Sequence, residues 1–415
     1  MGSIHISNTQ ELRNFNQHKI LQALYFHDPI SRQEVSRLTG LSVATITNLI
    51  TAWLDEKVIL ESGTKQSGGG RPRVMLTLNR EYGAFVGIDL GETHIRFELF
   101  DLKMNLLHTV TSWLDDADVQ PRDVVEEVVT GYRQLLTAVA FPEEKILGVG
   151  IGVPGVVQRE GGISVFAPNW GWHDVQLLAQ IQEYITPPII MDNGAKALGL
   201  AEMWFGVRPG TQHFIALLLG TGVGTAIIAD GSLQRGISNS AGEWGHMTLD
   251  LNGRVCRCGG QGCLETYVGA PGIIQTLREI APDSAWLQNH SQLDIIDQIL
   301  AAADDHHAIA MAILAQTTHY LGAGIANLIN LYNPQTIVLG GWLGNRLGSF
   351  VLEQLPAYIE KYALPQPRAN IKLRLSQLGD NGIAMGAACL ILEDFLHGKR
   401  NSWRLSTGTV SLLSN

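Results

Sequence analysis

The sequence has few cysteines and no long apolar run, and each shortage excludes a class of protein. Four cysteines in 415 residues are too few for the disulfide framework of a small secreted domain. No apolar run approaches the ~18 residues that span a bilayer, and the amino terminus lacks the charged and then apolar pattern of an export signal. We therefore expect a cytoplasmic protein without a membrane segment, long enough for two or three domains.

The charge is distributed unevenly along the chain. The net charge of −10 argues against indiscriminate binding to nucleic acid. Residues 1–80, however, carry nine Lys and Arg against six Asp and Glu, a net charge of +3, which leaves −13 for residues 81–415. We therefore expect a mildly basic head that can approach phosphates and an acidic body that stays away from them.

The head has the pattern of three helices. Apolar residues at helical spacing over 10–27 predict a first helix that stops at Asp28-Pro29. Ser31 and Glu34 have the spacing of a capping box that begins a second helix, and Gly40 ends it. Helix, short glycine turn and helix is the pattern of a helix-turn-helix. The side chains that we expect to contact bases and phosphates in a major groove lie at the start of the third helix: Ser42, Thr45, Thr47 and Asn48.

A basic, glycine-rich loop follows these helices. Residues 58–60 and 74–78 look like two strands, and Lys65, Gly68-Gly69-Gly70 and Arg71 lie between them. A flexible loop that presents an arginine suits a wing inserted in a narrow minor groove, so we predict that Arg71 contacts DNA. The alternative is a helical bundle for protein contacts with the loop as a linker. The order of capping box, turn, polar helix start and basic wing favours DNA binding.

The body contains several junctions between a strand and a glycine turn. The strand at 85–88 runs into Asp89-Leu90-Gly91-Glu92-Thr93, with 95–100 as a hairpin partner. This Asp-x-Gly-x-Thr turn resembles the phosphate loop of the actin and hexokinase superfamily, although alone it could equally be a tight hairpin. Two further apolar strands end in glycines at 220–225 and 340–341, which indicates a two-lobed α/β body.

Three of the four cysteines are clustered beside a histidine. Gly242-Glu243-Trp244-Gly245-His246 precedes Cys256-Arg257-Cys258 and Cys263-Leu264-Glu265. One histidine and three cysteines match a tetrahedral zinc site, and a closed set of four ligands is typical of a structural metal. The predicted ligands are His246, Cys256, Cys258 and Cys263. The alternative is a buried cluster of reduced cysteines.

These motifs together resemble the ROK family of repressors, open reading frames and sugar kinases, and within it the xylose-repressor type. The resemblance covers essentially the whole chain and implies a winged helix-turn-helix followed by a two-lobed, actin/hexokinase-like body. The limits that we expect are 1–82 for the DNA-binding domain, 83–193 for a small lobe completed by a helix at about 383–415, and 194–382 for a large lobe with the zinc site.

The resemblance also implies a sugar in the cleft between the lobes. The residues that would contact it are Gly155, Asn169, Asn193, Glu243, His246 and Glu265. Carboxylates and amides form paired hydrogen bonds to neighbouring hydroxyls, and such a site rejects analogues that lack a hydroxyl. His246 would both ligate zinc and face the sugar, so the metal would orient a binding residue. Outside these motifs, Glu243 or Glu265 would more often be a surface acid.

A kinase of this family has an aspartate directly after the asparagine of an Asn-Asp-Ala-Asn-Ala segment, and that aspartate takes the proton of the sugar hydroxyl. Here the segment is Asp192-Asn193-Gly194-Ala195-Lys196-Ala197, with Gly194 at the catalytic position. If the alignment with the kinase segment is shifted by two residues, Asp192 becomes the base. This alignment needs two compensating deletions before Glu202, which disfavours it. Glu92 stands where kinases usually have a second glycine, and its like charge should weaken ATP binding. We therefore expect no catalytic residue and no ATP.

The resulting hypothesis is a sugar-responsive repressor of carbohydrate-utilisation genes. Its partners would be operator DNA, a small sugar effector and further copies of the chain, as a homodimer or tetramer, with structural Zn²⁺ as cofactor. One rival is a ROK sugar kinase with a regulatory DNA-binding head, against which Gly194 argues. Another is a ROK-type protein controlled by a protein partner, whereas the retained polar residues favour a small ligand.

Overall fold

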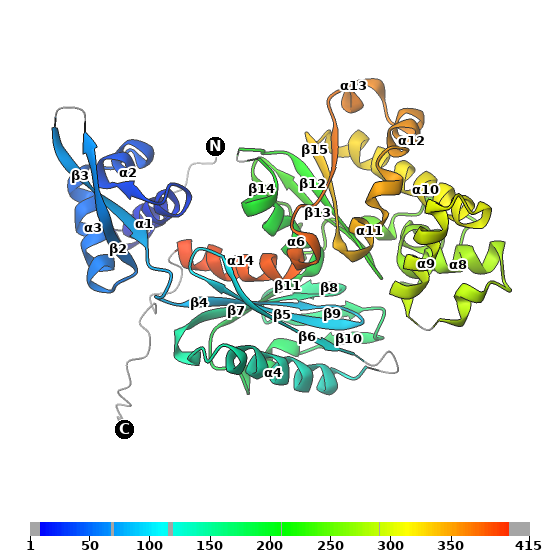
Figure 1. Ribbon diagram of the computed structural model, residues 1–415, viewed down its shortest axis with the longest axis horizontal. Coiled ribbons are helices and arrows are strands. Elements are labelled where there is room, and N and C mark those ends of the chain that lie inside the picture. Colours follow the sequence, from blue (N-terminus) through cyan, green and yellow to red (C-terminus); the bar gives the residue numbers. More distant parts are fainter. Residues whose placement is uncertain (1–8, 68–69, 115–118, 209, 290, 398–415) are drawn as a thin grey trace.

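A head and a two-lobed body are joined by short connections (Figure 1). The computed structural model describes residues 9–67, 70–114, 119–208, 210–289 and 291–397. The described residues form a three-stranded head sheet, two five-stranded sheets and one further three-stranded sheet, with helices between them. The α/β class and the two lobes predicted from the sequence are confirmed.

The head begins with three helices. These are α1 (Thr9–Phe26), α2 (Arg32–Thr39) and α3 (Val43–Asp55). The predicted capping box begins α2, because the Glu34 amide donates to the Ser31 hydroxyl at 3.3 Å and the Ser31 amide donates to the Glu34 carboxylate at 3.0 Å. Gly40 ends α2 with a φ of 74°, and Ser42 caps α3 by accepting from the Thr45 amide at 3.1 Å.

The head continues with a hairpin. Its strands are β1 (Ile30–Ser31), β2 (Ile59–Ser67) and β3 (Gly70–Leu78), in the order β1-β3-β2. The hairpin is longer than the predicted 58–60 and 74–78, because antiparallel pairing continues through polar residues such as Lys65 opposite Arg73. The predicted tip, Gly68-Gly69, lies outside the described residues. The hairpin projects from the head beside α3 (Figure 1).

The small lobe is built on a sheet in the order β11-β7-β4-β5-β6. Its strands are β4 (Ala84–Leu90), β5 (His94–Asp101), β6 (Leu106–Trp113), β7 (Ile146–Val153) and β11 (Ile189–Asn193). A second sheet in the order β10-β9-β8, one long helix and two short helical elements complete it: β8 (Val156–Gln158), β9 (Ile163–Ala167), β10 (Trp172–Val175), α4 (Pro121–Ala138), η1 (Glu143–Lys145) and α5 (Leu177–Gln182). In the large sheet, β4 pairs antiparallel with β5 and parallel with β7.

The large lobe repeats this arrangement in the order β14-β13-β12-β15-β16. Its strands are β12 (Phe214–Leu219), β13 (Val223–Ala229), β14 (Ser232–Leu233), β15 (Thr336–Gly340) and β16 (Lys372–Leu375). β12 pairs antiparallel with β13 and parallel with β15, as β4 does with β5 and β7. The turns of the two hairpins, β4–β5 and β12–β13, therefore occupy equivalent places in the two lobes.

Helices cover the large-lobe sheet and link the lobes. They are α6 (Gly194–Ala201), η2 (Glu202–Gly206), η3 (Trp244–His246), α7 (Glu265–Val268), α8 (Ala270–Ile280), η4 (Ala285–Gln288), α9 (Gln292–Asp304), α10 (Ala308–Tyr332), α11 (Gly341–Val351), α12 (Leu355–Tyr362), α13 (Pro365–Arg368), η5 (Gly379–Asn381) and α14 (Gly382–His397). Within the described ranges, α10 is the one helix long and apolar enough to cross a membrane by length and composition. The sequence analysis did not expect such a helix, but Ile313, Leu321 and Ile325 of α10 are fully buried in the large-lobe core.

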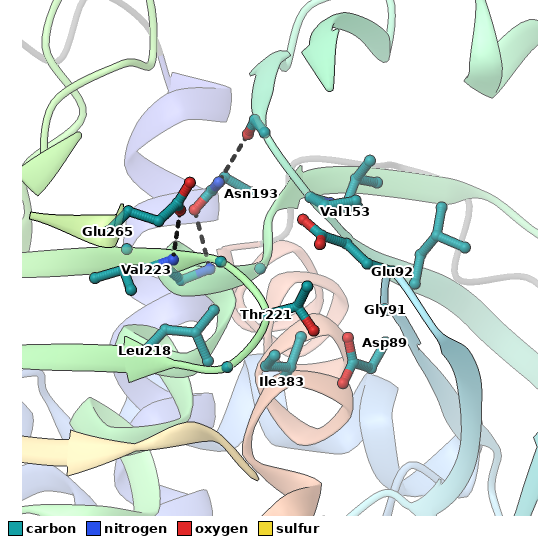
Figure 2. A pocket seen from close by; sticks show the side chains of 18 of the residues that line it. Asp89, Gly91, Glu92, Val153, Asn193, Leu218, Thr221, Val223, Glu265 and Ile383 are labelled. Atoms are coloured by element: carbon teal, nitrogen blue, oxygen red, sulfur yellow. Dashed lines mark hydrogen bonds between the residues drawn. The ribbon is translucent and has the colours of Figure 1, made fainter. Parts of the chain in front are cut away.

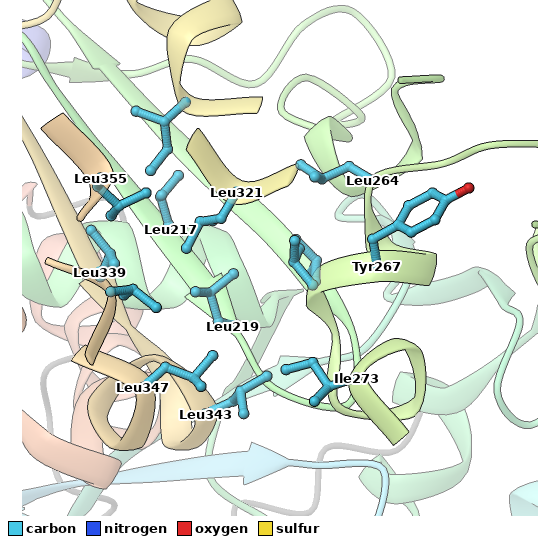
Figure 3. Close-up of a cluster of buried hydrophobic side chains, with 14 of the residues drawn as sticks. Leu217, Leu219, Leu264, Tyr267, Ile273, Leu321, Leu339, Leu343, Leu347 and Leu355 are labelled. Carbon is cyan, nitrogen blue, oxygen red and sulfur yellow. The ribbon is translucent and has the colours of Figure 1, made fainter. Parts of the chain in front are cut away.

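The large-lobe core holds the loop that carries the predicted zinc ligands. Leu217 and Leu339 of neighbouring strands pack with Leu321 of α10 (Figure 3). Leu264, which follows the predicted ligand Cys263 directly, is also fully buried in this cluster. Each fully buried leucine contributes roughly 1.5–3 kcal/mol, so the core fixes the position of the loop.

The head shares a core with the body. One buried cluster contains Leu24 of α1, Leu392 of α14 and Leu200 of α6, together with Phe85 and Phe100 of the small-lobe sheet. α14 packs against α6 and on the sheet face opposite α4 (Figure 1). The predicted limits at 82/83 and 193/194 fall between β3 and β4 and between β11 and α6. The domain limits remain predictions, and residues 398–415 of the predicted last helix lie outside the described residues.

Candidate functional site

A cavity of about 150 Å³ lies between the two lobes. The β4–β5 turn, from Asp89 to His94, lines one side, and the β12–β13 turn, from Gly220 to Thr225, lines the other. Figure 2 shows Asp89 and Glu92 facing Thr221 across this space. Both glycine turns singled out in the sequence therefore belong to one site.

Five of the six predicted sugar residues line this cavity. They are Gly155, Asn193, Glu243, His246 and Glu265. The sixth, Asn169, is exposed at its edge, where its Oδ1 accepts a hydrogen bond from Arg257 Nη1 at 2.8 Å. Their contact with a sugar remains a prediction.

Asn193 holds the turn between β11 and α6. Its Oδ1 accepts from the Ala195 and Lys196 amides at 2.9 and 3.2 Å, so it is the N-cap of α6. Its Nδ2 donates to the Gly155 carbonyl at 2.8 Å. Gly155 has a φ of 74°, and a Cβ there would lie 2.1 Å from the Phe166 carbonyl oxygen, so only glycine fits. Asn193 thus fixes the cavity wall and keeps one amide hydrogen for a ligand.

Two carboxylates reach the cavity from the large lobe. Glu265 Oε2 accepts from the Val223 amide at 2.9 Å, which orients this side chain at the start of β13 (Figure 2). Burial raises the pKa of Glu243, and the positive charge of Lys196 partly offsets this effect. Lys196 itself is only 1% exposed, and burial lowers its pKa. Both carboxylates can accept hydrogen bonds from hydroxyl groups.

The four predicted zinc ligands come together beside the cavity. One ligand atom from each of His246, Cys256, Cys258 and Cys263 lies within 4.8 Å of the others. The Cys258 and Cys263 sulfurs are 3.8 Å apart, and Cys256 Sγ is 3.8 Å from His246 Nδ1. A tetrahedron with Zn–S bonds of about 2.3 Å has edges of about 3.8 Å, so this donor set fits zinc. With Nδ1 on the metal side, the His246 ring has Nε2 left for a ligand in the cavity.

Gly194 stands where the sequence analysis expects the catalytic base of a kinase, and this assignment remains a prediction. Gly194 is the first residue of α6 and lines the cavity, and a Cβ built there would meet Ile383 only at 3.6 Å or more. A side chain would therefore fit. The neighbouring Asp192 is fully buried, forms an ion pair with Arg235 and accepts from Asn239 Nδ2 at 2.9 Å. Its carboxylate is engaged in this buried network, which argues against the shifted register.

Arg257 was missed as a site residue by the sequence analysis. Its guanidinium bonds both oxygens of Glu92 at 3.0 and 3.1 Å and Glu265 Oε1 at 3.0 Å. Its place between Cys256 and Cys258 was the available signal, since a residue between two ligands of one metal projects from a fixed backbone. Glu92 is therefore neutralised by Arg257, which weakens the argument from like-charge repulsion of ATP.

Two buried carboxylates lie in the strands that flank the β4–β5 turn. Burial raises the pKa of Asp89 to about 7 and that of Glu98 to about 8, while Arg96 partly offsets both shifts. Arg96 Nη1 lies 3.8 Å from Glu98 Oε1, and neither oxygen of Glu98 has a hydrogen-bond partner in the described part of the chain. Near neutral pH these groups take up protons that an exposed carboxylate would release.

The predicted DNA contacts lie on the start of α3. Ser42, Thr47 and Asn48 are exposed and Thr45 is half-buried. The Thr47 hydroxyl donates to the Val43 carbonyl at 2.8 Å, so in this arrangement it offers an acceptor oxygen to DNA.

The structure also places exposed Lys65 and Arg73 opposite each other on the hairpin. The side chain of Arg71, at the start of β3, lies outside the described residues. These DNA contacts remain predictions.

In the comparisons with known proteins, some matches cover the body alone and others cover nearly the whole chain. The family model described as ROK family matches residues 85–394. The chain is 31% identical to the xylose repressor of Bacillus spizizenii over 94% of this chain and 98% of the repressor. It resembles the structure of a ROK family transcriptional regulator, a homolog of the E. coli MLC protein, with a TM-score of 0.78 and 27% identity over 93% of this chain and 97% of that one. A Streptomyces griseus ROK family glucokinase with glucose and AMPPNP has a TM-score of 0.67 and 26% identity, over 74% of this chain and 99% of the kinase.

Proposed function

The chain belongs to the ROK family, and from this premise we propose that it is a sugar-responsive transcriptional regulator, a repressor of carbohydrate-utilisation genes. It binds operator DNA through the head and a sugar in the cleft between the lobes. The similarity to the xylose repressor and to the transcriptional regulator extends over more than nine-tenths of the chain. The glucokinase structure matches 74% of it. The regulator is therefore the better template for the whole protein.

One observation carries the proposal. The part of the cavity lined by Asn193, Glu243, His246 and Glu265, called the sugar side below, keeps its polar side chains, whereas the residue at the expected position of the base is Gly194. A sugar hydroxyl would find carboxylate, imidazole and amide partners there, and a buried set of such groups discriminates strongly against ligands that lack a hydroxyl. Without a base, proton abstraction from the sugar loses about 10²–10⁴ in rate. The protein then binds a sugar and does not phosphorylate it.

We assign the metal to a structural role. His246, Cys256, Cys258 and Cys263 would hold Zn²⁺, which supplies four bonds that close the loop. The closed ligand set leaves no coordination position for substrate. Through His246 and Arg257, which stand on this loop, the metal would fix side chains on the sugar side of the cavity.

The head supplies the contact with DNA. Ser42, Thr45, Thr47 and Asn48 present polar atoms at the start of α3, the end of a recognition helix that enters a major groove. Arg71, with Lys65 and Arg73, would contact phosphates or the minor groove from the hairpin. A homodimer or tetramer in the cytoplasm suits a repressor, since two heads can bind two half-sites.

The packing offers a physical route from the cleft to the head. α6 is capped by Asn193 in the cavity wall and continues into the π-helix η2, which contains Trp204. The Trp204 ring stacks on Phe26, the last residue of α1, with 5.1 Å between centroids and 9° between planes. Tyr25 contacts Trp204 edge-on at 5.8 Å. A shift of α6 on sugar binding therefore acts directly on the first helix of the head.

The second candidate is a sugar kinase with a DNA-binding head, which the similarity of the body to a glucokinase favours. Both candidates predict sugar binding. They differ in turnover, because a kinase consumes ATP at rates of the order of 1–10³ s⁻¹.

Binding and turnover measured on one preparation test the proposal. Operator sequences are selected from random duplex DNA, and their affinity is measured by fluorescence anisotropy with D-glucose, D-xylose or N-acetylglucosamine, without nucleotide. We expect one sugar to change the affinity at least fivefold, with no ATP consumption in a coupled assay. Sugar-dependent ATP turnover at ordinary kinase rates would support the kinase instead.

A further inference from the structure

A charged cluster joins the two lobes inside the cavity. The Arg257 Nη1 and Nη2 atoms donate to Glu92 Oε2 and Oε1 at 3.0 and 3.1 Å, in the parallel geometry of an arginine and a carboxylate. Nε donates to Glu265 Oε1 at 3.0 Å, and Nη1 also donates to Asn169 Oδ1 at 2.8 Å. All three nitrogens of Arg257 are thus engaged. Glu92 and Asn169 come from the small lobe, whereas Arg257 and Glu265 come from the large lobe.

This cluster lies against both glycine turns. Glu92 follows Gly91 in the β4–β5 turn. In the β12–β13 turn, a Cβ on Gly222 would lie 3.0 Å from Arg257 Nη2 and 3.6 Å from Glu92 Oε1. The absence of a side chain on Gly222 therefore leaves room for the ion pair. The side chains of Glu92 and Arg257 are 11% and 24% exposed, so the pair is largely withdrawn from solvent.

The components around the carboxylate are those of an anion site. A guanidinium fork binds carboxylates and phosphates with the same two parallel hydrogen bonds. Glycine turns let an oxyanion approach the backbone closely. The anion present in this site belongs to the protein itself. We propose that the Glu92 carboxylate is a built-in substitute for a phosphate ligand, and that with Arg257 it links the two lobes without nucleotide.

The ion pair between Glu92 and Arg257 also has a consequence for sugar binding. This part of the inference rests on the proposed function. Asn169 and Glu265 are two of the predicted sugar residues, and Arg257 uses one oxygen of each. A sugar hydroxyl that donates to Glu265 Oε1 competes with Arg257 for that oxygen. Arg257 also bonds Glu92 and Asn169 of the small lobe, so a sugar that displaces Arg257 from Glu265, or that takes Asn169 Oδ1 itself, alters the bonds that tie the lobes together. A phosphate group, in contrast, has to displace Glu92 before it can reach Arg257.

The test is a titration with inorganic phosphate, with sodium chloride at matched ionic strength as reference. Glu92→Gly removes the internal anion, and Glu92→Gln removes its charge while keeping its shape. We expect a saturable rise in melting temperature with phosphate for both variants, because a ligand bound only by the native state stabilises it. The phosphate affinity should be at least tenfold higher than in the wild-type protein.

Two further variants test whether Arg257 is the positively charged group that binds the phosphate. In Glu92→Gly/Arg257→Gln the response to phosphate should disappear. Glu279→Gln frees part of Arg254, an arginine of the same loop whose Nε and Nη2 bond Glu279, but Arg254 does not line the cavity between the lobes. This control should behave like wild type. Circular dichroism and zinc content verify that each variant is folded.

The proposal is overturned if wild type and both Glu92 variants respond equally, or if the double variant keeps the response. The titration uses neither DNA nor sugar. Its failure therefore leaves the regulator proposal standing, and a failure of operator binding leaves the anion site standing.

Discussion

The turns of two equivalent hairpins border the cavity, but the chemistry on its two sides differs. On the sugar side, Glu243, His246 and Glu265 line the cavity beside the cluster of metal ligands. On the side of the β4–β5 turn, Glu92 is bound to Arg257, and at the start of α6 Gly194 stands where the sequence analysis expects the base of a kinase. Because the two sheets have the same strand order, the difference lies in the turns, loops and helix starts that border the cavity and not in the sheets. Binding and catalysis can therefore be lost separately on one scaffold.

The largest effect is expected from replacing one of the predicted zinc ligands beside the sugar side. Cys258→Ser removes one of four ligands, and structural zinc sites contribute energy directly to folding. We expect loss of zinc, a drop of several degrees in melting temperature and loss of sugar binding. Metal analysis and calorimetry measure these changes. Cys389→Ala, at a buried cysteine outside the cluster, is the control that should keep its zinc; unchanged metal content in Cys258→Ser would remove the metal from the account.

The next effect is a pH-dependent change in stability at Glu98, in the strand that follows the β4–β5 turn. The pKa of Glu98 is raised from 4.5 to about 8, so the native state holds a proton that the unfolded chain releases. The stabilisation is present below about pH 4.5 and is lost as the pH rises through about 8, an effect on the order of a few kcal/mol. We expect Glu98→Gln to unfold at higher denaturant concentration than wild type at pH 8.5. Urea unfolding at pH 6 and 8.5 measures it, and equal pH slopes in both proteins would contradict it.

A smaller effect is expected from a single polar residue on the sugar side. Glu243→Gln replaces a carboxylate acceptor by an amide, and a hydrogen bond to a charged group contributes about 1.5–3 kcal/mol. We expect sugar affinity to fall about 10–100-fold with zinc content unchanged. Calorimetry with the sugar found in the operator experiment measures this. Glu160→Gln, at an exposed glutamate outside the cavity, should bind normally; wild-type affinity in Glu243→Gln would exclude Glu243 from the site.

The smallest effect is expected where the cavity communicates with the head. Trp204→Ala removes the ring stacked on Phe26, while sugar and DNA contacts stay intact. We expect sugar affinity and operator affinity each to remain within about twofold, while the effect of sugar on operator affinity falls below the 5–150-fold typical of allosteric coupling. Anisotropy titrations with and without sugar measure it. Trp204→Phe should restore the coupling, and Trp113→Ala, at an exposed tryptophan, should not change it; full coupling in Trp204→Ala would refute this route.

Local signals in the sequence predicted much of the fold. The Ser31 and Glu34 capping box and the Gly40 helix end have short-range causes, and the structure contains both of them. That His246, Cys256, Cys258 and Cys263 come together could be predicted because their spacing is itself the requirement for a metal site, while the metal remains a prediction. The two lobes followed from the glycine turns. The length of α10 was not expected, because its mean hydropathy is moderate and its burial depends on tertiary packing.

The charged cluster could not be predicted because it depends on long-range contacts. Arg257 and Glu92 are 165 residues apart, and Arg257 and Asn169 are 88 apart. Nothing in the local pattern around Glu92 indicates that a cation neutralises it. The stack of Trp204 on Phe26 is equally distant in sequence. Local motifs thus identify which residues can carry chemistry, while the lobe arrangement decides which of them meet.

The most direct test of the central claim is a titration of the nucleotide-free protein with sugar while operator binding is followed by anisotropy. The account predicts saturable sugar binding in calorimetry and a change in operator affinity at the same sugar concentrations, both unchanged when Mg-ATP is added. Sugar binding that requires Mg-ATP, or formation of a sugar phosphate during the titration, would contradict it.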